Sequence, residues 1–269
     1  MNLQVKRKIA QLFFLLSANL GAFGLKSGMC YPFFYCHACP SADAACPLRS
    51  LEIGVFRGNI TWKLLLFPLV IIGMVGIISG RAVCGWACPI GLLQRATSPV
   101  PRKLQKLSLF KKMGSLKIEP YLRYTKYICL LGLVLITPFL IGFMFTDICP
   151  VGFLTGTIPI LILNPGQFVP SFYFYPALLI FVLFFVLIFT VERGWCRYFC
   201  PVGALLAPLN KISYLSVEVN TKECIHCNAC SSVCPMGIDV PTMVRDPECI
   251  LCGKCISTCP KSIIHYKRT

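Results

Sequence analysis

Long apolar stretches alternate with short polar or charged segments along most of this chain. Four of these stretches cover residues 9–28, 60–79, 127–145 and 174–191. Each has about 18–20 residues, enough for a helix rising 1.5 Å per residue to cross the roughly 30 Å hydrocarbon core of a bilayer. The pattern therefore predicts an all-α bundle of four transmembrane helices. A composition with 56% hydrophobic and only 13% charged residues agrees with a membrane protein.

The basic residues are distributed unevenly between the loops. Residues 81–126 contain ten Lys and Arg and a single acid, Glu119, whereas residues 147–171 contain no basic residue. Positive loops stay in the cytoplasm, so the N-terminus, the basic loop and the C-terminus are expected on the cytoplasmic side of the cell membrane. The net charge of +16 then reports topology, and no nucleic-acid partner is expected. The basic loop also suits anionic lipid or an acidic electron carrier.

The last fifty residues contain the cysteine run C-x2-C-x2-C-x3-C-P twice. This run is typical of bacterial ferredoxins with two 4Fe–4S clusters, in which the fourth cysteine of each run binds the other cluster. The expected ligands of the first cluster are Cys224, Cys227, Cys230 and Cys259, and those of the second are Cys249, Cys252, Cys255 and Cys234. Zinc sites are the alternative, but zinc usually takes two C-x2-C pairs with a longer spacer. We expect iron at these cysteines.

An internal repeat links the ends of the second and fourth apolar stretches. A shift of 112 residues superposes an Arg, two Cys, a Pro and a Gly of the two C-x3-C-P segments. The two copies imply tandem units of two helices each. Their four thiols could hold an inner-face Fe–S cluster: Cys84, Cys88, Cys196 and Cys200. The alternative is that these cysteines only shape a packed corner, as small hydrophobic residues.

The segments after the first and third apolar stretches also carry cysteines. Four of them could hold an outer-face cluster: Cys36, Cys39, Cys46 and Cys149. Cys30 would then be a spare thiol. Disulfides remain the alternative, because the outer side is oxidising in many cells. His37 lies among these cysteines, and none of the three histidines lies inside an apolar stretch, so no haem is expected in the bundle.

These motifs divide the chain into a membrane domain, residues 1–213, and an α+β two-cluster ferredoxin domain, residues 214–269. Together, the four apolar stretches, the paired C-x3-C-P segments and the double ferredoxin run resemble the NapH-type membrane polyferredoxins, and NosR-type proteins share the C-terminal half. The resemblance implies electron transfer between the membrane quinone pool and a redox partner protein. It carries over to the four C-x3-C-P cysteines and the eight ferredoxin cysteines.

The expected function is therefore that of a membrane-bound electron-transfer subunit in an oxidoreductase complex. Electrons would pass between the cytoplasmic clusters and either quinone, as in a quinol dehydrogenase, or an outer-face partner. A soluble ferredoxin is a further candidate partner. The cysteine-rich outer segment departs from the simple quinol dehydrogenase pattern. It leaves open a second function, in which the protein reduces or delivers a metal while a respiratory enzyme is assembled.

Overall fold

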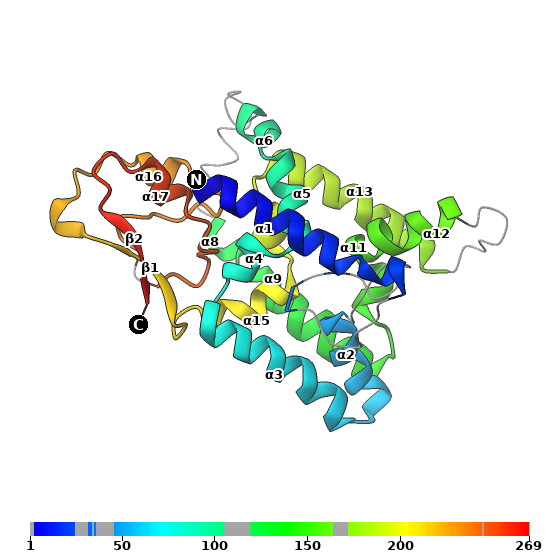
Figure 1. The fold of residues 1–269 in the computed structure, drawn as a ribbon. Coiled ribbons are helices and arrows are strands. Elements are labelled where there is room, and N and C mark those ends of the chain that lie inside the picture. The colour runs from blue at the N-terminus through cyan, green and yellow to red at the C-terminus, as the bar shows by residue number, and fades with distance from the viewer. Residues whose placement is uncertain are drawn as a thin grey trace.

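The protein is described from a computed structural model covering residues 3–24, 32–33, 35, 46–104, 119–163, 172–243 and 245–268. Helices make up most of these residues, and one two-stranded sheet lies at the end that holds both chain termini (Figure 1). The apolar helices extend from this end toward the opposite one, where α2 and α12 lie. The prediction of a mostly helical chain with a ferredoxin-like C-terminal unit is confirmed.

The apolar stretches form helices of unequal length. α3 (Trp62–Ser79) is the one helix in the described residues that is long and apolar enough to cross a membrane. The other stretches give shorter helices: α13 (Phe174–Thr190), and the continuous run Thr125–Leu140. That run consists of α9 (Thr125–Ile128), the π-helical η3 (Cys129–Ile136) and α10 (Thr137–Leu140). The expected bundle of four transmembrane helices therefore remains a prediction.

The first helix is displaced from its expected position. α1 spans Leu3–Ala18 and is followed by η1 (Leu20–Phe23), whereas the apolar pattern placed a helix at residues 9–28. The shift brings the polar start of the chain into the fold. Arg7 is 1% exposed and donates a hydrogen bond from Nε to the Gly85 carbonyl, at 2.8 Å. The sequence pattern counts Arg7 among the charges that mark the cytoplasmic side, but in the structure its side chain lies in the packed interior.

A Cys-Pro step begins a short helix at four places in the chain. Cys46, Cys88, Cys149 and Cys200 each occupy the N-cap, and the following proline occupies the first turn. Proline is suited to this position because its missing N–H would have no helical partner. The helices that begin in this way are α2 (Pro47–Gly54), α5 (Pro89–Thr97), α11 (Pro150–Gly152) and α15 (Pro201–Leu209).

Short helices complete the corners around these steps. α4 (Ala82–Trp86) precedes α5, and α14 (Gly194–Tyr198) precedes α15, so the two copies of the repeat have the same local structure. The remaining short elements of the first 213 residues are η2 (Phe56–Gly58), α6 (Pro99–Leu104), α8 (Glu119–Leu122), η4 (Phe145–Ile148), η5 (Phe153–Thr157) and α12 (Ile158–Leu163).

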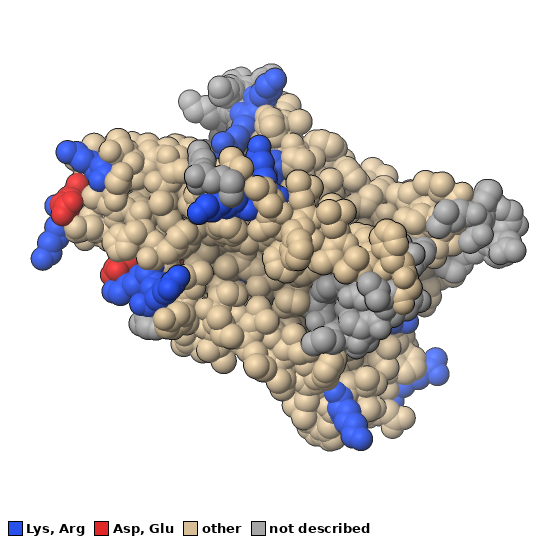
Figure 2. Space-filling view, in the orientation of Figure 1, with Lys and Arg blue, Asp and Glu red and all other residues tan. Residues whose placement is uncertain are grey.

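The C-terminal unit is built around an antiparallel strand pair. β1 (Leu215–Val219) pairs with β2 (Ile264–Arg268), with Val217 opposite Tyr266. Between the strands lie η6 (Thr221–Glu223), α16 (Ala229–Ser232) and α17 (Lys254–Thr258). Figure 2 shows Lys and Arg side chains gathered over this unit and around α6, with a broad surface of other residues over the apolar helices.

Candidate iron–sulfur centres

The second ferredoxin ligand set surrounds one cavity. Four cysteines line a hollow together with apolar side chains such as Met236 and Val240. These are Cys249, Cys252 and Cys255 of the second run and Cys234 of the first. The structure thus brings together the four residues that the motif assigned to one cluster, including the exchanged fourth cysteine.

The first ligand set surrounds a separate cavity. Its lining includes Cys224, Cys227 and Cys230 of the first run and Cys259 of the second. Cys227 of this set is exposed, whereas none of the four cysteines around the other cavity is exposed. The first cavity is therefore the one closer to solvent. We call it the distal cavity, and the cavity lined by Cys249 the proximal cavity.

Both cysteine runs follow the wall of their cavity with the same pair of left-handed backbone residues. His226 and Leu251, each two residues after the first cysteine of its run, have positive φ, and so do Asn228 and Gly253, each four residues after it. Such left-handed turns direct backbone N–H groups to one side and favour an anion there. The Leu251 N–H, for example, is hydrogen-bonded to the Cys249 thiol.

The cysteines around each cavity are not grouped as ligands of a single metal ion. Within the ranges that the structure describes, no three His, Cys, Asp or Glu side chains form a group that could hold a single ion. A 4Fe–4S cluster has a different requirement, because each of its four thiolates binds a different iron. Cysteines set around a hollow fit a cluster better than they fit zinc.

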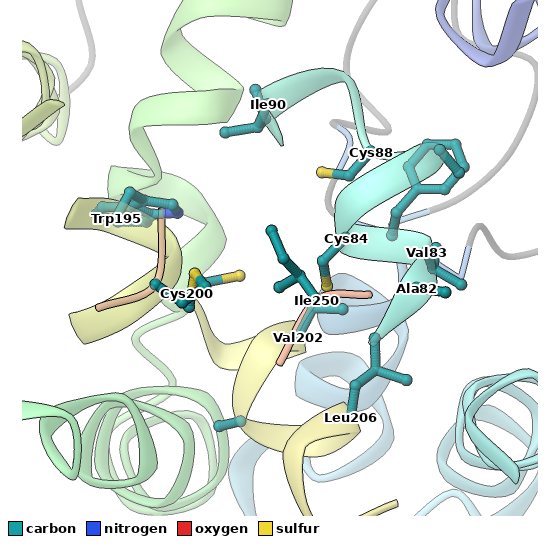
Figure 3. Close-up of a cluster of buried hydrophobic side chains, with 14 of the residues drawn as sticks. Ala82, Val83, Cys84, Cys88, Ile90, Trp195, Cys200, Val202, Leu206 and Ile250 are labelled. Atoms are coloured by element: carbon teal, nitrogen blue, oxygen red, sulfur yellow. The ribbon is translucent and has the colours of Figure 1, made fainter. Parts of the chain in front are cut away.

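The four C-x3-C-P cysteines lie together between the two copies of the repeat. Cys84, Cys88, Cys196 and Cys200 are all buried. Figure 3 shows the sulfur atoms of Cys84, Cys88 and Cys200 facing a common space, with Ile250 beside them. Two thiols already accept hydrogen bonds, Cys196 from Gln94 Nε2 at 3.1 Å and Cys200 from the Gly203 N–H at 3.4 Å. We call these four residues the inner cysteine set.

Buried positive charge surrounds the inner cysteine set. Five cationic side chains on this side of the molecule are at most 7% exposed: Arg7, Arg81, Lys126, Arg193 and Arg197. Two acids, Glu192 and Glu248, are buried with them. Buried charges are costly unless they are paired. A cluster held by four thiolates carries net negative charge, so the surplus of cations fits an Fe–S cluster at the inner set.

One buried carboxylate joins the ferredoxin unit to the rest of the chain. Glu248 accepts a hydrogen bond from Arg81 Nη1 at 2.8 Å and forms an ion pair with Lys126 Nζ. Burial alone would raise the pKa of Glu248, but Arg81 and Lys126 together hold it below its ordinary value. Burial and the Arg81 charge lower the pKa of Lys126 to about 8. Glu248 directly precedes Cys249, so this network anchors the wall of the proximal cavity.

The loop after Glu248 packs directly on the inner cysteine corner. Asn210 Nδ2 donates to the Cys249 carbonyl at 3.0 Å, and Trp86 Nε1 donates to the Leu251 carbonyl at 2.8 Å. A Cβ at Gly85 would lie 2.3 Å from the Ile250 carbonyl oxygen. Only a residue without a side chain permits this approach. Ile250 therefore lies between the proximal cavity and the inner set.

Only part of the predicted outer set can be located. Cys46 and Cys149 are both buried, at the N-caps of α2 and α11. Cys36 and Cys39, like Cys30 and His37, lie outside the described residues. Near this corner Glu52 is fully buried and accepts hydrogen bonds from the N–H and the hydroxyl of Thr146. Burial raises the pKa of Glu52 to about 7.

The sequence pattern pointed to the cysteines but not to the charged residues around them. Arg7, Arg81 and Lys126 read as charges that mark the cytoplasmic side, and Arg193 read only as part of the repeat. The repeat contained one signal, because Arg81 and Arg193 are equivalent under the 112-residue shift. Glu248 gave no signal beyond its position next to Cys249.

Comparison with known proteins identifies the family. A 4Fe-4S binding domain model matches residues 60–108 and 173–215, and a 4Fe-4S dicluster domain model matches residues 216–260. The chain is 30% identical to the uncharacterized protein MJ0750 of Methanocaldococcus jannaschii, over 88% of this chain and 84% of that protein. It is 29% identical to the ferredoxin-type protein NapH of Escherichia coli, over 73% of this chain. The chain belongs to the NapH-type polyferredoxin family.

Other relatives carry ferredoxin-type names as well. The methylamine utilization ferredoxin-type protein MauN of Methylorubrum extorquens is 26% identical over 72% of this chain. The matched regions cover 61% of the length of NapH and 60% of the length of MauN. No solved structure matches the chain. The two segments of the 4Fe-4S binding model each contain one C-x3-C-P copy, and the chain is thus a ferredoxin-type iron–sulfur electron-transfer protein.

Proposed function

We propose that this NapH-type polyferredoxin is a membrane-bound subunit that passes electrons between cytoplasmic clusters and the membrane. Clusters in the distal cavity, in the proximal cavity and at the inner cysteine set form a relay in that order. The observation that carries the proposal is the close packing of the Ile250 carbonyl against Gly85, where an added Cβ would lie only 2.3 Å from the carbonyl oxygen. This packing places the wall of the proximal cavity in direct contact with α4, which carries Cys84.

Membrane insertion is supported by the apolar surface of the helices. Large hydrophobic side chains on three separate helices are 60–69% exposed: Met74, Ile128 and Leu179. Exposed apolar surface of this extent on several helices suits lipid contact. We therefore propose that residues 1–213 form a four-helix transmembrane domain, with both termini and the ferredoxin domain, residues 214–269, in the cytoplasm.

The clusters supply the electron-accepting chemistry, and the chain controls their surroundings. Its residues bury the inner thiols, donate hydrogen bonds to Cys196 and Cys200, and provide cations around them. Gln94 Oε1 and Arg81 Nε are buried polar atoms without a hydrogen-bond partner among the described residues. Both belong to side chains that touch the inner set or its backbone.

A lipophilic electron carrier also has a suitable place on this chain. An apolar hollow of about 570 Å³ is lined by side chains of α2, α3, η3 and α10, among them Leu51, Leu69 and Phe139. π-Helical segments are frequently found at functional sites. We propose that quinone binds there. An outer-face cluster at Cys36, Cys39, Cys46 and Cys149 would extend the relay toward an extracytoplasmic partner.

Single cysteine variants test the relay. In anaerobic membranes, Cys200→Ser should leave the ferredoxin clusters reducible by dithionite but abolish their reoxidation by a quinone analogue. Cys129→Ser is the matched control, because Cys129 belongs to no proposed ligand set and is not among the residues that line the proposed quinone hollow. Equal reoxidation in the Cys200→Ser variant and the wild type would refute a relay through the inner set.

A further inference from the structure

The two copies of the repeat exchange arginines across the inner cysteine set. Arg81, in the first copy, donates from Nη2 to the Cys196 carbonyl of the second copy at 3.2 Å. Its equivalent Arg193, in the second copy, donates from Nη1 to the Cys84 carbonyl of the first copy at 3.1 Å. Cys84 and Cys196 are themselves equivalent. The same contact is therefore made twice, in opposite directions.

The equivalent glycines leave room for these arginines. A Cβ at Gly203 would lie 3.0 Å from Arg81 Nη2, and a Cβ at Gly91 would lie 3.3 Å from Arg193 Nη1. Arg193 also donates from Nη2 to the Gly91 carbonyl at 3.0 Å. Each copy thus supplies an arginine and receives the arginine of the other against its own C-P-x-G segment. The arrangement fixes the separation of the two C-x3-C turns.

The two arginines differ in how their charge is offset. Arg81 is completely buried and forms an ion pair with Glu248 of the ferredoxin unit. Arg193 is 1% exposed, and in the described part of the chain it binds only carbonyl groups and no carboxylate. A guanidinium keeps its charge under all ordinary conditions. Arg193 therefore places an unneutralised positive charge next to the inner cysteine set.

We propose that Arg81 and Arg193 are paired positioning residues of the inner cluster, and that Arg193 in addition raises its midpoint potential. The inference rests on the proposed cluster at the inner cysteine set. Reduction adds one electron to a cluster that is already negative. A nearby cation in a poorly polarisable environment stabilises that reduced state more than the oxidised one.

The test is an anaerobic EPR redox titration of the full-length protein in detergent, together with iron analysis. Arg193→Gln should lower the midpoint potential of the inner cluster. At the wild-type midpoint, we expect its ratio of reduced to oxidised cluster to fall at least tenfold, which is about 59 mV for one electron. Arg193→Lys, which keeps the charge, should stay within threefold of the wild type. Lys267→Gln, a charge loss at the exposed Lys267–Glu218 pair, should leave the inner midpoint unchanged.

Iron content distinguishes the two proposed roles of Arg193, which are to position the inner cluster and to raise its midpoint potential. Loss of the inner iron in Arg193→Gln, with retention in Arg193→Lys and intact ferredoxin signals in both, would also support the proposal. An unchanged midpoint and full iron content in Arg193→Gln would overturn it, as would equal iron loss in the Lys and Gln variants. If the wild type itself holds only about eight iron, the proposed inner cluster fails, and the arginine inference fails with it. If the wild type holds about twelve iron and the Gln variant matches it in both iron content and inner midpoint, the arginine inference alone fails.

Discussion

Replacing Glu248 by Gln removes the one carboxylate that pairs with two buried cations. Arg81 and Lys126 have side chains with no exposed surface, and the Glu248 side chain is 11% exposed. The amide keeps one oxygen, which can accept a hydrogen bond from Arg81. Its N–H₂ group can only donate and then lies near the Lys126 ammonium, or near the guanidinium if the amide is flipped. The substitution therefore leaves at least one cation buried without a partner.

The expected loss of stability follows from the burial of Glu248 and of its two partners, Arg81 and Lys126. Breaking a buried ion pair by removing one partner costs about 3–5 kcal/mol. Because Glu248 reaches solvent at one edge, we place the expected loss at about 3 kcal/mol. A change of 1 kcal/mol shifts the midpoint of thermal unfolding by about 4–8 °C in small domains of 60–100 residues. The ferredoxin unit, residues 214–269, should then melt about 12–24 °C earlier and separate from the inner corner.

The assay is thermal unfolding of the anaerobic protein in detergent, followed by the loss of cluster absorbance. Glu218→Gln is the matched control, because Glu218 pairs with Lys267 at the exposed strand edge, where such pairs add little stability. Glu218→Gln should melt with the wild type. If Glu248→Gln also melts within 2 °C of the wild type, the buried network does not anchor the ferredoxin unit and the reasoning is wrong.

Two further predictions concern the packing at the two ends of the membrane domain. Gly85→Ala should cost about 1–3 kcal/mol of stability and slow electron transfer from the ferredoxin clusters to the inner cluster, because its Cβ meets the Ile250 carbonyl. The control is Gly73→Ala, whose Cβ meets nothing within 4 Å, and which should lose no stability and leave electron transfer unchanged. Glu52 has a folded pKa of about 7 against an ordinary 4.5, so the folded state keeps a proton that the unfolded state releases, and stability should fall as the pH rises from 4.5 to 7. The span of 2.5 pH units corresponds to at most about 3 kcal/mol. Melting curves at pH 5 and pH 8 should show this loss in the wild type and not in Glu52→Gln, and an identical pH dependence in the two proteins would contradict the assignment.

The cysteine motifs predicted which cysteines lie together around the two ferredoxin cavities. Spacing alone indicated that Cys234 and Cys259 would exchange places, and each lies at the cavity of the other run. Motifs of this kind are local, and their turns depend on a few residues such as Asn228 and Gly253. The Cys-Pro steps likewise predicted where short helices begin, because proline at the first turn acts through its own geometry.

The interior charges could not be predicted in the same way. Counting Lys and Arg assigns each of them to a solvated loop, but Arg7 and Lys126 are buried because Gly85 and Glu248 supply partners from distant parts of the chain. The form of the helices could not be predicted either. Hydropathy gave one apolar stretch at residues 127–145, whereas the structure changes to π-helix at Cys129. Hydrophobicity does not distinguish these two helical forms.

The central claim is that a cluster at the inner cysteine set stands next to the proximal ferredoxin cluster. The most direct test is iron and acid-labile sulfide per chain on anaerobically purified protein, with EPR spectra of the fully reduced state. The account predicts about twelve or more iron per chain and a spin interaction between the inner and proximal clusters that disappears in Cys84→Ser. About eight iron per chain, with spectra that are the same in the wild type and in Cys84→Ser, would contradict it.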